Sequence, residues 1–331
     1  METISIKGLG LAASRIGLGT WAIGGWMWGG TDEQEAIRTI HAALDRGITL
    51  IDTAPVYGFG QAEEIVGKAL STAGARHRAI VATKVGLDWQ DGKVFRNSSP
   101  TRIVEEIDAS LRRLKTDVID IYQVHWPDSR VPLHETASAI ERLRRAGKIR
   151  AVGVSNFTPR QIELFGKYTP VATVQPPLNL FERDAERDVL PFARSHKLTV
   201  LAYGALCRGL LSGKMKASTR FEGDDLRRND PKFQPPRFAQ YLAAVAELDR
   251  FARAEFGKSV LALAVRWVLD QGPTVALWGA RKPQQLEAVD EAMGWKLTPD
   301  AKQEIERILQ AHVHDAIGPQ FMAPPIRARA A

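Results

Sequence analysis

The sequence predicts an α/β protein with a (β/α)8 TIM-barrel fold, formed by residues 1–331 as a single domain. Short apolar runs typical of buried parallel strands recur along the chain, and segments with helical periodicity separate them. The predicted strands are Arg15–Thr20, Thr49–Asp52, Ala79–Lys84, Val118–Gln123, Ile149–Ser155, Val171–Gln175, Thr199–Tyr203 and Thr274–Trp278. A length of 331 residues suits one closed barrel of such units. A doubly wound sheet would show the same alternation and stays open at this stage.

The elements between and around the strands also follow from the sequence. One helix is indicated by Ala36, Ile40, Ala43 and Leu44, which share one face at helical spacing. A short N-terminal hairpin is expected from Thr3–Ile6 and Gly8–Leu11. The gap before the last strand is long, and it predicts a loop over 204–237 followed by the helices Ala239–Phe256 and Ser259–Gln271, one more than the barrel needs. The tail after Leu309 lacks periodicity and should run over the surface.

Composition narrows the class of function. The net charge of +7 is spread along the chain, with no basic patch interleaved with aromatic residues, so nucleic acid is not an expected partner. A single cysteine, Cys207, excludes internal disulfides and a cysteine-rich zinc site. No apolar run is long enough to span a bilayer, and no secretory pattern is evident. We expect a cytoplasmic protein with no metal and no obligate protein partner.

Polar side chains stand where several predicted strands end. Asp52 and Lys84 close otherwise apolar runs, where an unpaired charge would be costly, so we expect them to pair with each other. Tyr57 lies five residues past Asp52, and His125 follows the fourth strand. Further polar residues at the same ends are Ser155, Asn156, Gln175 and Tyr203. In a barrel, these ends converge on one mouth.

These residue types suit the polarisation of a carbonyl group. A phenol with a pKa of about 10 is a weak proton donor near neutrality. The Lys84 ammonium beside it should lower the pKa of Tyr57, while Asp52 holds Lys84 in position. His125 could donate a hydrogen bond to the substrate oxygen. Such an acid site needs a hydride from elsewhere.

Several motifs resemble the signatures of the aldo-keto reductase family. They are Asp52-Thr-Ala-Pro-Val-Tyr57-Gly, Thr83-Lys84, Gln123-Val-His125-Trp126, Gly153-Val-Ser155-Asn156-Phe, Gln175-Pro-Pro-Leu-Asn179 and Gly279-Ala-Arg281. The resemblance covers about residues 16–295 and is greatest to the bacterial aldehyde-reductase branch related to potassium-channel β subunits. It implies NADPH-dependent, reversible reduction of aldehydes or ketones to alcohols, with Asp52, Tyr57, Lys84 and His125 as catalytic residues.

The resemblance also implies where NADPH binds. Ser155, Asn156 and Gln175 would hold the nicotinamide carboxamide, Tyr203 would stack on the ring, and Arg281 would meet the 2′-phosphate. The complete predicted set of cofactor contacts is Gly19, Thr20, Trp21, Ser155, Asn156, Gln175, Tyr203, Leu206, Cys207, Gly209, Leu210, Lys214, Gly279, Arg281 and Gln285. We expect Trp21, Trp26, Trp28 and Trp126 to wall the pocket of a small carbonyl substrate, although Trp26 and Trp28 could instead pack on the surface.

The chain departs from the family pattern near the cofactor. The usual Tyr-Ser-Pro-Leu-Gly reads Tyr203-Gly-Ala-Leu-Cys207 here, and Trp278 replaces a proline at the end of the last strand. Two other functions are compatible with parts of the pattern. One is a regulatory subunit that binds NADPH and senses redox state. The other is an aldolase with a Schiff base on Lys84, which would require a neutral amine without a close carboxylate.

Overall fold

The structure, a computed structural model that describes residues 1–72 and 74–327, is built on a closed barrel of eight parallel strands. In barrel order the strands are β3 (Ile16–Gly19), β4 (Leu50–Asp52), β5 (Ile80–Val85), β8 (Ile119–Val124), β9 (Ile149–Ser155), β10 (Val171–Gln175), β11 (Thr199–Ala202) and β12 (Thr274–Gly279). Pairing of β12 with β3 closes the circle. Each predicted strand is present to within about two residues, so the barrel is confirmed and the doubly wound sheet is excluded.

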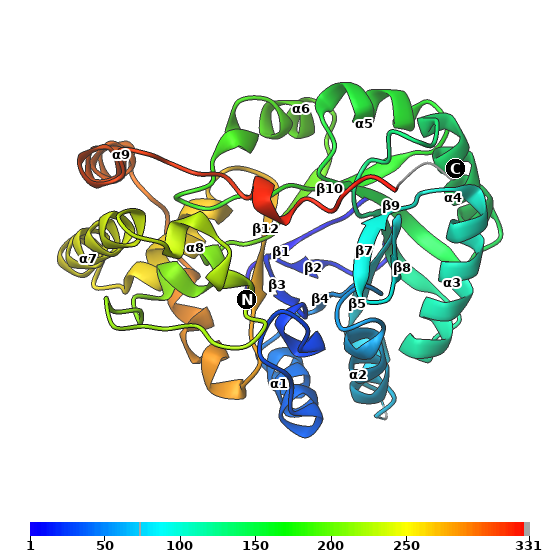
Figure 1. Ribbon diagram of the computed structural model, residues 1–331, viewed down its shortest axis with the longest axis horizontal. Helices are drawn as coiled ribbons and strands as arrows, with labels where there is room; N and C mark the ends of the chain where they lie inside the picture. Colours follow the sequence, from blue (N-terminus) through cyan, green and yellow to red (C-terminus); the bar gives the residue numbers. More distant parts are fainter. Residues whose placement is uncertain (73, 328–331) are drawn as a thin grey trace.

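Helices surround the barrel, as the helical segments between the predicted strands lead us to expect (Figure 1). They are α1 (Glu33–Asp45), α2 (Gln61–Leu70), α3 (Pro100–Leu114), α4 (Leu133–Arg145), α5 (Pro159–Gly166), α6 (Val189–Ser195), α7 (Arg237–Phe256), α8 (Val260–Leu269) and α9 (Pro299–His312). Capping side chains define where two of these helices begin. Asp32 accepts a hydrogen bond from the Glu35 amide at the start of α1, and Ser99 accepts one from the Arg102 amide at the start of α3. The additional helix expected before the last strand is α7.

Two hairpins lie outside the barrel sheet. The N-terminal hairpin pairs β1 (Thr3–Ile4) with β2 (Ala13–Ser14), so its second arm is wrong in the prediction. The predicted arm, Gly8–Leu11, is mostly exposed, whereas Ala13 and Ser14 are fully buried and therefore gain more from pairing. The second hairpin, β6 (Leu87–Gln90) with β7 (Lys93–Arg96), was not predicted. Its signal is the turn dipeptide Asp91-Gly92, which has positive φ at both residues.

The C-terminal tail crosses the barrel rather than leaving it. After α9 the chain passes a short 3-10 turn and reaches the β6–β7 hairpin, as the red segment of Figure 1 shows. There, Arg96 donates its backbone N–H to Pro325 O (2.9 Å) and its Nε–H to Pro324 O (2.9 Å). On the way, Lys232 Nζ donates to Gly318 O (3.3 Å). The tail is thus attached to elements that stand at the mouth of the barrel.

The inside of the barrel changes character along its axis. The lower part is apolar and packed, with Leu50, Ile80, Ile121 and Leu201 buried in one cluster that Ile6 closes from below. The upper part, toward the C-terminal ends of the strands, holds the fully or almost fully buried polar residues Asp52, Lys84, Gln123, Thr173 and Gln175. A packed floor beneath a polar layer directs any chemistry to the upper mouth.

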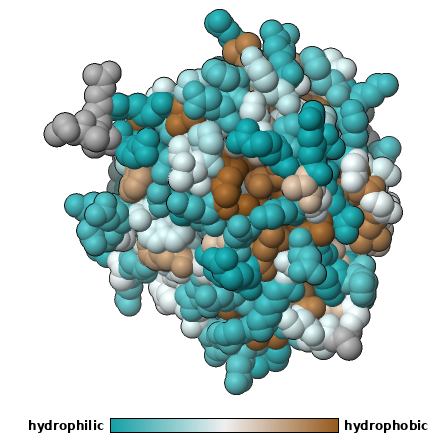
Figure 2. All heavy atoms as spheres, turned by 90° about the vertical axis from the view of Figure 1, so that its right-hand side faces the viewer, coloured by the Kyte–Doolittle hydropathy of each residue, from teal (hydrophilic) through white to brown (hydrophobic). Residues whose placement is uncertain are grey.

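The outer surface carries few large apolar side chains. Figure 2 shows the face on the right of Figure 1, which is mainly hydrophilic with apolar side chains gathered near its middle. Among the described residues, no helix is long and apolar enough to cross a membrane.

Gly67 lets the backbone of α2 approach the end of α3 closely. A Cβ at this position would lie 2.2 Å from Arg113 O and 2.9 Å from the Leu114 backbone. We therefore expect Gly67→Ala to lower the free energy of unfolding by about 1–3 kcal/mol, since backbone has to move to relieve the overlap. Urea unfolding measures this. Gly166→Ala at the end of α5 is the control, because nothing lies within 4 Å of its Cβ position; it should be neutral or stabilising. Equal effects of the two substitutions would contradict this reading of the packing.

Candidate active site

The structure brings Asp52, Tyr57, Lys84 and His125 together at the upper mouth. The Lys84 side chain, at the end of β5, is fully buried. Its Nζ donates to Asp52 Oδ2 (2.6 Å), to Thr53 O (2.9 Å) and to the Tyr57 hydroxyl oxygen (3.2 Å). The predicted pairing of Asp52 with Lys84 is therefore present, and one ammonium joins the carboxylate to the phenol.

Burial and charge set the protonation of this group. Burial lowers the pKa of Lys84, and the Asp52 carboxylate opposes that effect. For Tyr57, burial raises the pKa well above 10, and the negative charge of Asp52 raises it further. The sequence-based expectation that Lys84 lowers the pKa of Tyr57 is thus not met in this structure. The reason is burial: removal of the phenolate from water, with the Asp52 carboxylate nearby, outweighs the ammonium 3.2 Å from the hydroxyl.

His125 packs against Tyr57. The two rings meet edge to face with their centroids 5.9 Å apart. Burial lowers the pKa of His125 well below 6.5, and the nearby Lys84 charge acts in the same direction. The imidazole is therefore neutral at physiological pH and offers one N–H donor and one nitrogen acceptor.

A second set of predicted residues forms a hydrogen-bonded group beside the first. Asn156, which has a positive φ of 60°, donates from Nδ2 to His125 O (3.0 Å) and to Ser155 Oγ (3.0 Å). The Tyr203 hydroxyl donates to Asn156 Oδ1 (3.0 Å). Gln175 donates from Nε2 to Asp52 Oδ1 (2.8 Å). Residues from the ends of five strands are thus linked in one network.

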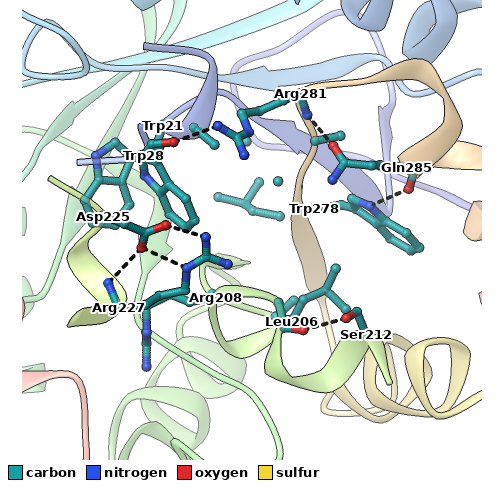
Figure 3. A pocket seen from close by; sticks show the side chains of 18 of the residues that line it. Trp21, Trp28, Leu206, Arg208, Ser212, Asp225, Arg227, Trp278, Arg281 and Gln285 are labelled. Atoms are coloured by element: carbon teal, nitrogen blue, oxygen red, sulfur yellow. Dashed lines mark hydrogen bonds and ion pairs between the residues drawn. The ribbon is translucent and has the colours of Figure 1, made fainter. Parts of the chain in front are cut away.

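A cavity of about 640 Å³ is lined by Tyr57 and Asp52 and also by Arg281. Figure 3 shows Arg281 at its wall together with Trp21, Trp28 and Arg227. Predicted site residues that line it are Gly19, Thr20, Trp21, Trp28, Asp52, Tyr57, Tyr203, Leu206, Gly209, Lys214, Gly279, Arg281 and Gln285. Arg281 donates to Trp28 O (2.7 Å), and the Gln285 side chain accepts from the Arg281 amide (2.7 Å). The cavity therefore reaches from Asp52 and Tyr57 to the end of the last barrel strand.

Other predicted residues lie away from the cavity wall. Cys207 and Leu210 are fully buried in the main hydrophobic core. Trp26 packs on Phe59, with the ring centroids 4.8 Å apart, and Trp126 lies beneath the guanidinium of Arg96 (5.1 Å). Of the predicted tryptophan wall, only Trp21 and Trp28 face the cavity.

Sequence reasoning missed several cavity residues in the loop after β11. Arg220, Phe221, Asp225 and Arg227 line the cavity. Arg227 Nε donates to Asp225 Oδ1 (2.9 Å), and the guanidinium lies over the rings of Phe221 (4.3 Å) and Trp28 (5.2 Å). Charged residues in this loop were visible in the sequence, but only the folded loop shows which of them turn inward.

Met322 of the tail also lines the cavity, as do Met215 and Trp278. The tail could not be assigned to the site from its sequence, because it has no periodicity that would place a side chain.

The charges along the cavity suit an elongated anionic ligand. Lys214, Arg220, Arg227 and Arg281 line its outer part, and Arg227 is paired with Asp225. Gly209 has a positive φ of 89°, a conformation that glycine adopts without strain, and it leaves the backbone at the wall accessible. The residues present thus fit a dinucleotide with phosphate groups. Within the described residues, no cluster of histidine, cysteine or carboxylate side chains could hold a metal ion.

Comparison with known proteins shows the family of the chain. The model of the aldo/keto reductase family matches residues 15–310. The chain is 60% identical over 328 residues to Aldo-keto reductase YhdN of Bacillus subtilis (strain 168), covering 99% of both chains. The chain belongs to the aldo/keto reductase family and is an NADP-dependent oxidoreductase.

Two solved structures are similar over nearly the whole chain. The glycerol dehydrogenase AKR11B4 from Gluconobacter oxydans has 57% identity and a TM-score of 0.89, with 97% of this chain and 99% of that chain covered. An aldo/keto reductase from Klebsiella pneumoniae, solved in complex with NADP and acetate, has 27% identity and a TM-score of 0.71, with 98% and 99% covered. The barrel and its surrounding helices are thus those of known aldo/keto reductases.

The depressed pKa of His125 predicts how stability depends on pH. As the pH falls below 6.5, the imidazole of this residue takes up a proton in the unfolded state before it does so in the folded state. This difference lowers the free energy of unfolding by up to about 1.4 kcal/mol per pH unit. The His125→Gln variant lacks this titrating group. When the pH is lowered from 6.5 to 5, the midpoint of thermal unfolding should therefore fall less in the variant than in the wild type. His77→Gln, at an exposed position, is the control and should follow the wild type. A His125→Gln curve parallel to the wild type over the whole range would refute the prediction.

Proposed function

We propose that this protein reduces small aldehydes or ketones to alcohols reversibly with NADPH, with Tyr57 as the proton donor. The observation that carries the proposal is the hydrogen-bonded chain from Asp52 through Lys84 to Tyr57 at the inner end of the cavity. Bound NADPH supplies the hydride. Among the four residues, Lys84 would stabilise the phenolate as it forms, Asp52 would position Lys84, and His125 would orient the carbonyl.

The direction of one hydrogen bond supports this role of Tyr57. An ammonium can only donate, so Lys84 Nζ uses a lone pair of the phenol oxygen and leaves the phenol's own proton for another acceptor. Because burial raises the pKa of Tyr57, the phenol is protonated at neutral pH and holds its proton ready. As negative charge develops on the substrate oxygen, that proton can move to it, and the adjacent ammonium then faces a phenolate.

His125 would act as a neutral hydrogen-bond donor. A neutral imidazole can hydrogen-bond the carbonyl oxygen without competing with Tyr57 for the transfer of the proton. Its lowered pKa supports this assignment, since an imidazolium beside Lys84 would be unfavourable.

We further propose how the cofactor is held. Ser155, Asn156 and Gln175 would face the carboxamide, with Tyr203 against the nicotinamide ring. The outer cavity would take the rest of the cofactor through Gly19, Thr20, Trp21, Leu206, Gly209, Lys214, Gly279, Arg281 and Gln285. Cys207 and Leu210 would contribute only through the backbone, because their side chains belong to the core.

A small hydroxylated substrate is favoured. The similar structure from Gluconobacter oxydans is a glycerol dehydrogenase, which supports a short polyol and its aldehyde or ketone as the substrate pair. Trp21 stacks near Tyr57, with ring centroids 5.9 Å apart, and would limit the size of the carbonyl compound.

With the single thiol buried and no disulfide to maintain, we place this activity in the cytoplasm.

Of the two alternatives, the aldolase is disfavoured. Its lysine must be a free amine, whereas Lys84 donates to a carboxylate at 2.6 Å.

The redox-sensing regulatory subunit would share the same four residues, and turnover separates it from a reductase. A panel of small aldehydes, with NADPH absorbance as the readout, should show steady-state reduction; absence of turnover with a bound cofactor would favour the regulatory role.

Tyr57→Phe tests the proton donor. Removing the hydroxyl should lower kcat about 10²- to 10⁴-fold, the range that general acid catalysis contributes, and should leave NADPH binding nearly unchanged. Steady-state rates and quenching of protein fluorescence by NADPH measure the two effects. A near-normal rate in this variant would show that another group donates the proton.

Arg281→Ala tests the site of the 2′-phosphate. Loss of a charge-assisted hydrogen bond should weaken NADPH binding about 10- to 100-fold and NADH binding much less. Lys282→Ala is the matched control, because it removes a neighbouring charge that does not line the cavity and that pairs with Glu35 (3.6 Å). Equal weakening of both cofactors by Arg281→Ala would place this guanidinium away from the 2′-phosphate.

A further inference from the structure

Gln123 is a buried amide in direct contact with the catalytic carboxylate. It lies on β8, two residues before His125, and its side chain is fully buried. Its Nε2 donates to Asp52 Oδ1 (3.2 Å) across the inside of the barrel. Neither the proton chain from Lys84 to Tyr57 nor the proposed cofactor contacts account for this residue.

The surroundings of Asp52 consist of donors. Oδ2 accepts from Lys84, and Oδ1 accepts from Gln123 and from Gln175 (2.8 Å). A carboxylate that receives three N–H groups fits this arrangement in its ionised form, and the donors fix the plane of the carboxylate as well as its position.

The strand register places Gln123 where it can reach Asp52. In the barrel, Lys84 pairs with Gln123, and Gln123 pairs with Gly153, so the three stand at one level. A Cβ at position 153 would lie 2.8 Å from Gln123 Cγ and 2.3 Å from Thr173 Oγ1. Glycine at this position therefore leaves the space through which the glutamine side chain crosses the barrel.

The hydrogen bond from Gln123 to Asp52 becomes most important when Gln175 contacts the cofactor instead of Asp52. In the proposed function, Gln175 faces the nicotinamide carboxamide, so one amide would serve both the cofactor and Asp52. A shift of Gln175 toward the cofactor would remove one of the two donors to Oδ1. Gln123 then remains as the amide that holds Asp52, and through Asp52 the position of Lys84 beside Tyr57.

We propose that Gln123 is a positioning residue for the reduction, which holds Asp52, and thereby Lys84, in register with Tyr57 when the cofactor is bound. This inference rests on the proposed function. It predicts an effect mainly on the reaction step, because Gln123 does not itself line the cavity: its side chain contacts Asp52 and, at 3.4 Å, the amide of Gln175.

Gln123→Leu keeps similar bulk and removes the amide. We expect kcat to fall tenfold or more, while KM for the aldehyde and the Kd of NADPH stay within twofold of the wild type. Thr173→Val is the matched control inside the barrel. The Thr173 hydroxyl is buried and has no hydrogen-bond partner among the described residues, so its loss should leave kcat within twofold. A Gln123→Leu enzyme with kcat within twofold of the wild type would overturn the proposal.

The pH profile of Gln123→Glu separates positioning from packing. A protonated glutamic acid can donate to Asp52 Oδ1 as the amide does, whereas an ionised one repels the carboxylate. We expect kcat of this variant to approach the wild type at acid pH and to fall as the pH rises, while the wild type shows no such decline. The same profile in both enzymes would contradict the proposal. Because the Gln123→Glu variant retains a hydrogen-bond donor at acid pH, it can test the proposal even if Gln123→Leu does not fold.

Failure of the proposed function can be told apart from failure of this inference. A wild type that binds NADPH and turns over no carbonyl refutes the reductase. The contact is tested independently of turnover by a double-mutant cycle of thermal unfolding with Gln123→Leu, Asp52→Asn and the double variant. Non-additive effects support the contact, and additive effects refute it whatever the activity.

Discussion

The site depends on one buried ammonium that lies between a carboxylate and a phenol. Lys84 is fully buried, and its cost of desolvation is balanced by Asp52 at 2.6 Å and by two further acceptors, Thr53 O and the Tyr57 hydroxyl. Because burial and the nearby Asp52 carboxylate raise the pKa of Tyr57, the phenol keeps its proton in the resting protein. The arrangement favours a neutral donor whose conjugate base is stabilised only as it forms, which is the differential stabilisation that catalysis requires.

The barrel supplies this geometry through the register of its strands. Asp52, Lys84 and Gln123 come from β4, β5 and β8, which are neighbours in the sheet, and parallel pairing turns their side chains to the same interior. The apolar floor below them excludes water from one side. The loop after β11 and the C-terminal tail bring Arg227 and Met322 to the cavity on the other side. The polar layer is thus enclosed by segments far apart in the sequence.

Much of this architecture could be predicted from the sequence because its signals are local. Strand composition, helix caps and the polar residues at strand ends gave the barrel and the grouping of Asp52, Tyr57, Lys84 and His125. The rest depends on tertiary structure. The direction of the Tyr57 pKa shift follows from how deeply the folded chain buries the phenol, which no spacing encodes. Trp26 and Trp126 pack away from the cavity, and Gln123 acquires its partner only when the barrel closes.

The most direct test of the role of Lys84 is a single-turnover measurement. Wild type and Lys84→Met are each loaded with NADPH, mixed with a reducible aldehyde, and followed by the loss of NADPH absorbance. If the ammonium stabilises the phenolate as the proton leaves Tyr57, the step slows about 100-fold or more in the variant, with the Kd of NADPH little changed. An unchanged single-turnover rate in a folded, NADPH-bound Lys84→Met protein would contradict the account.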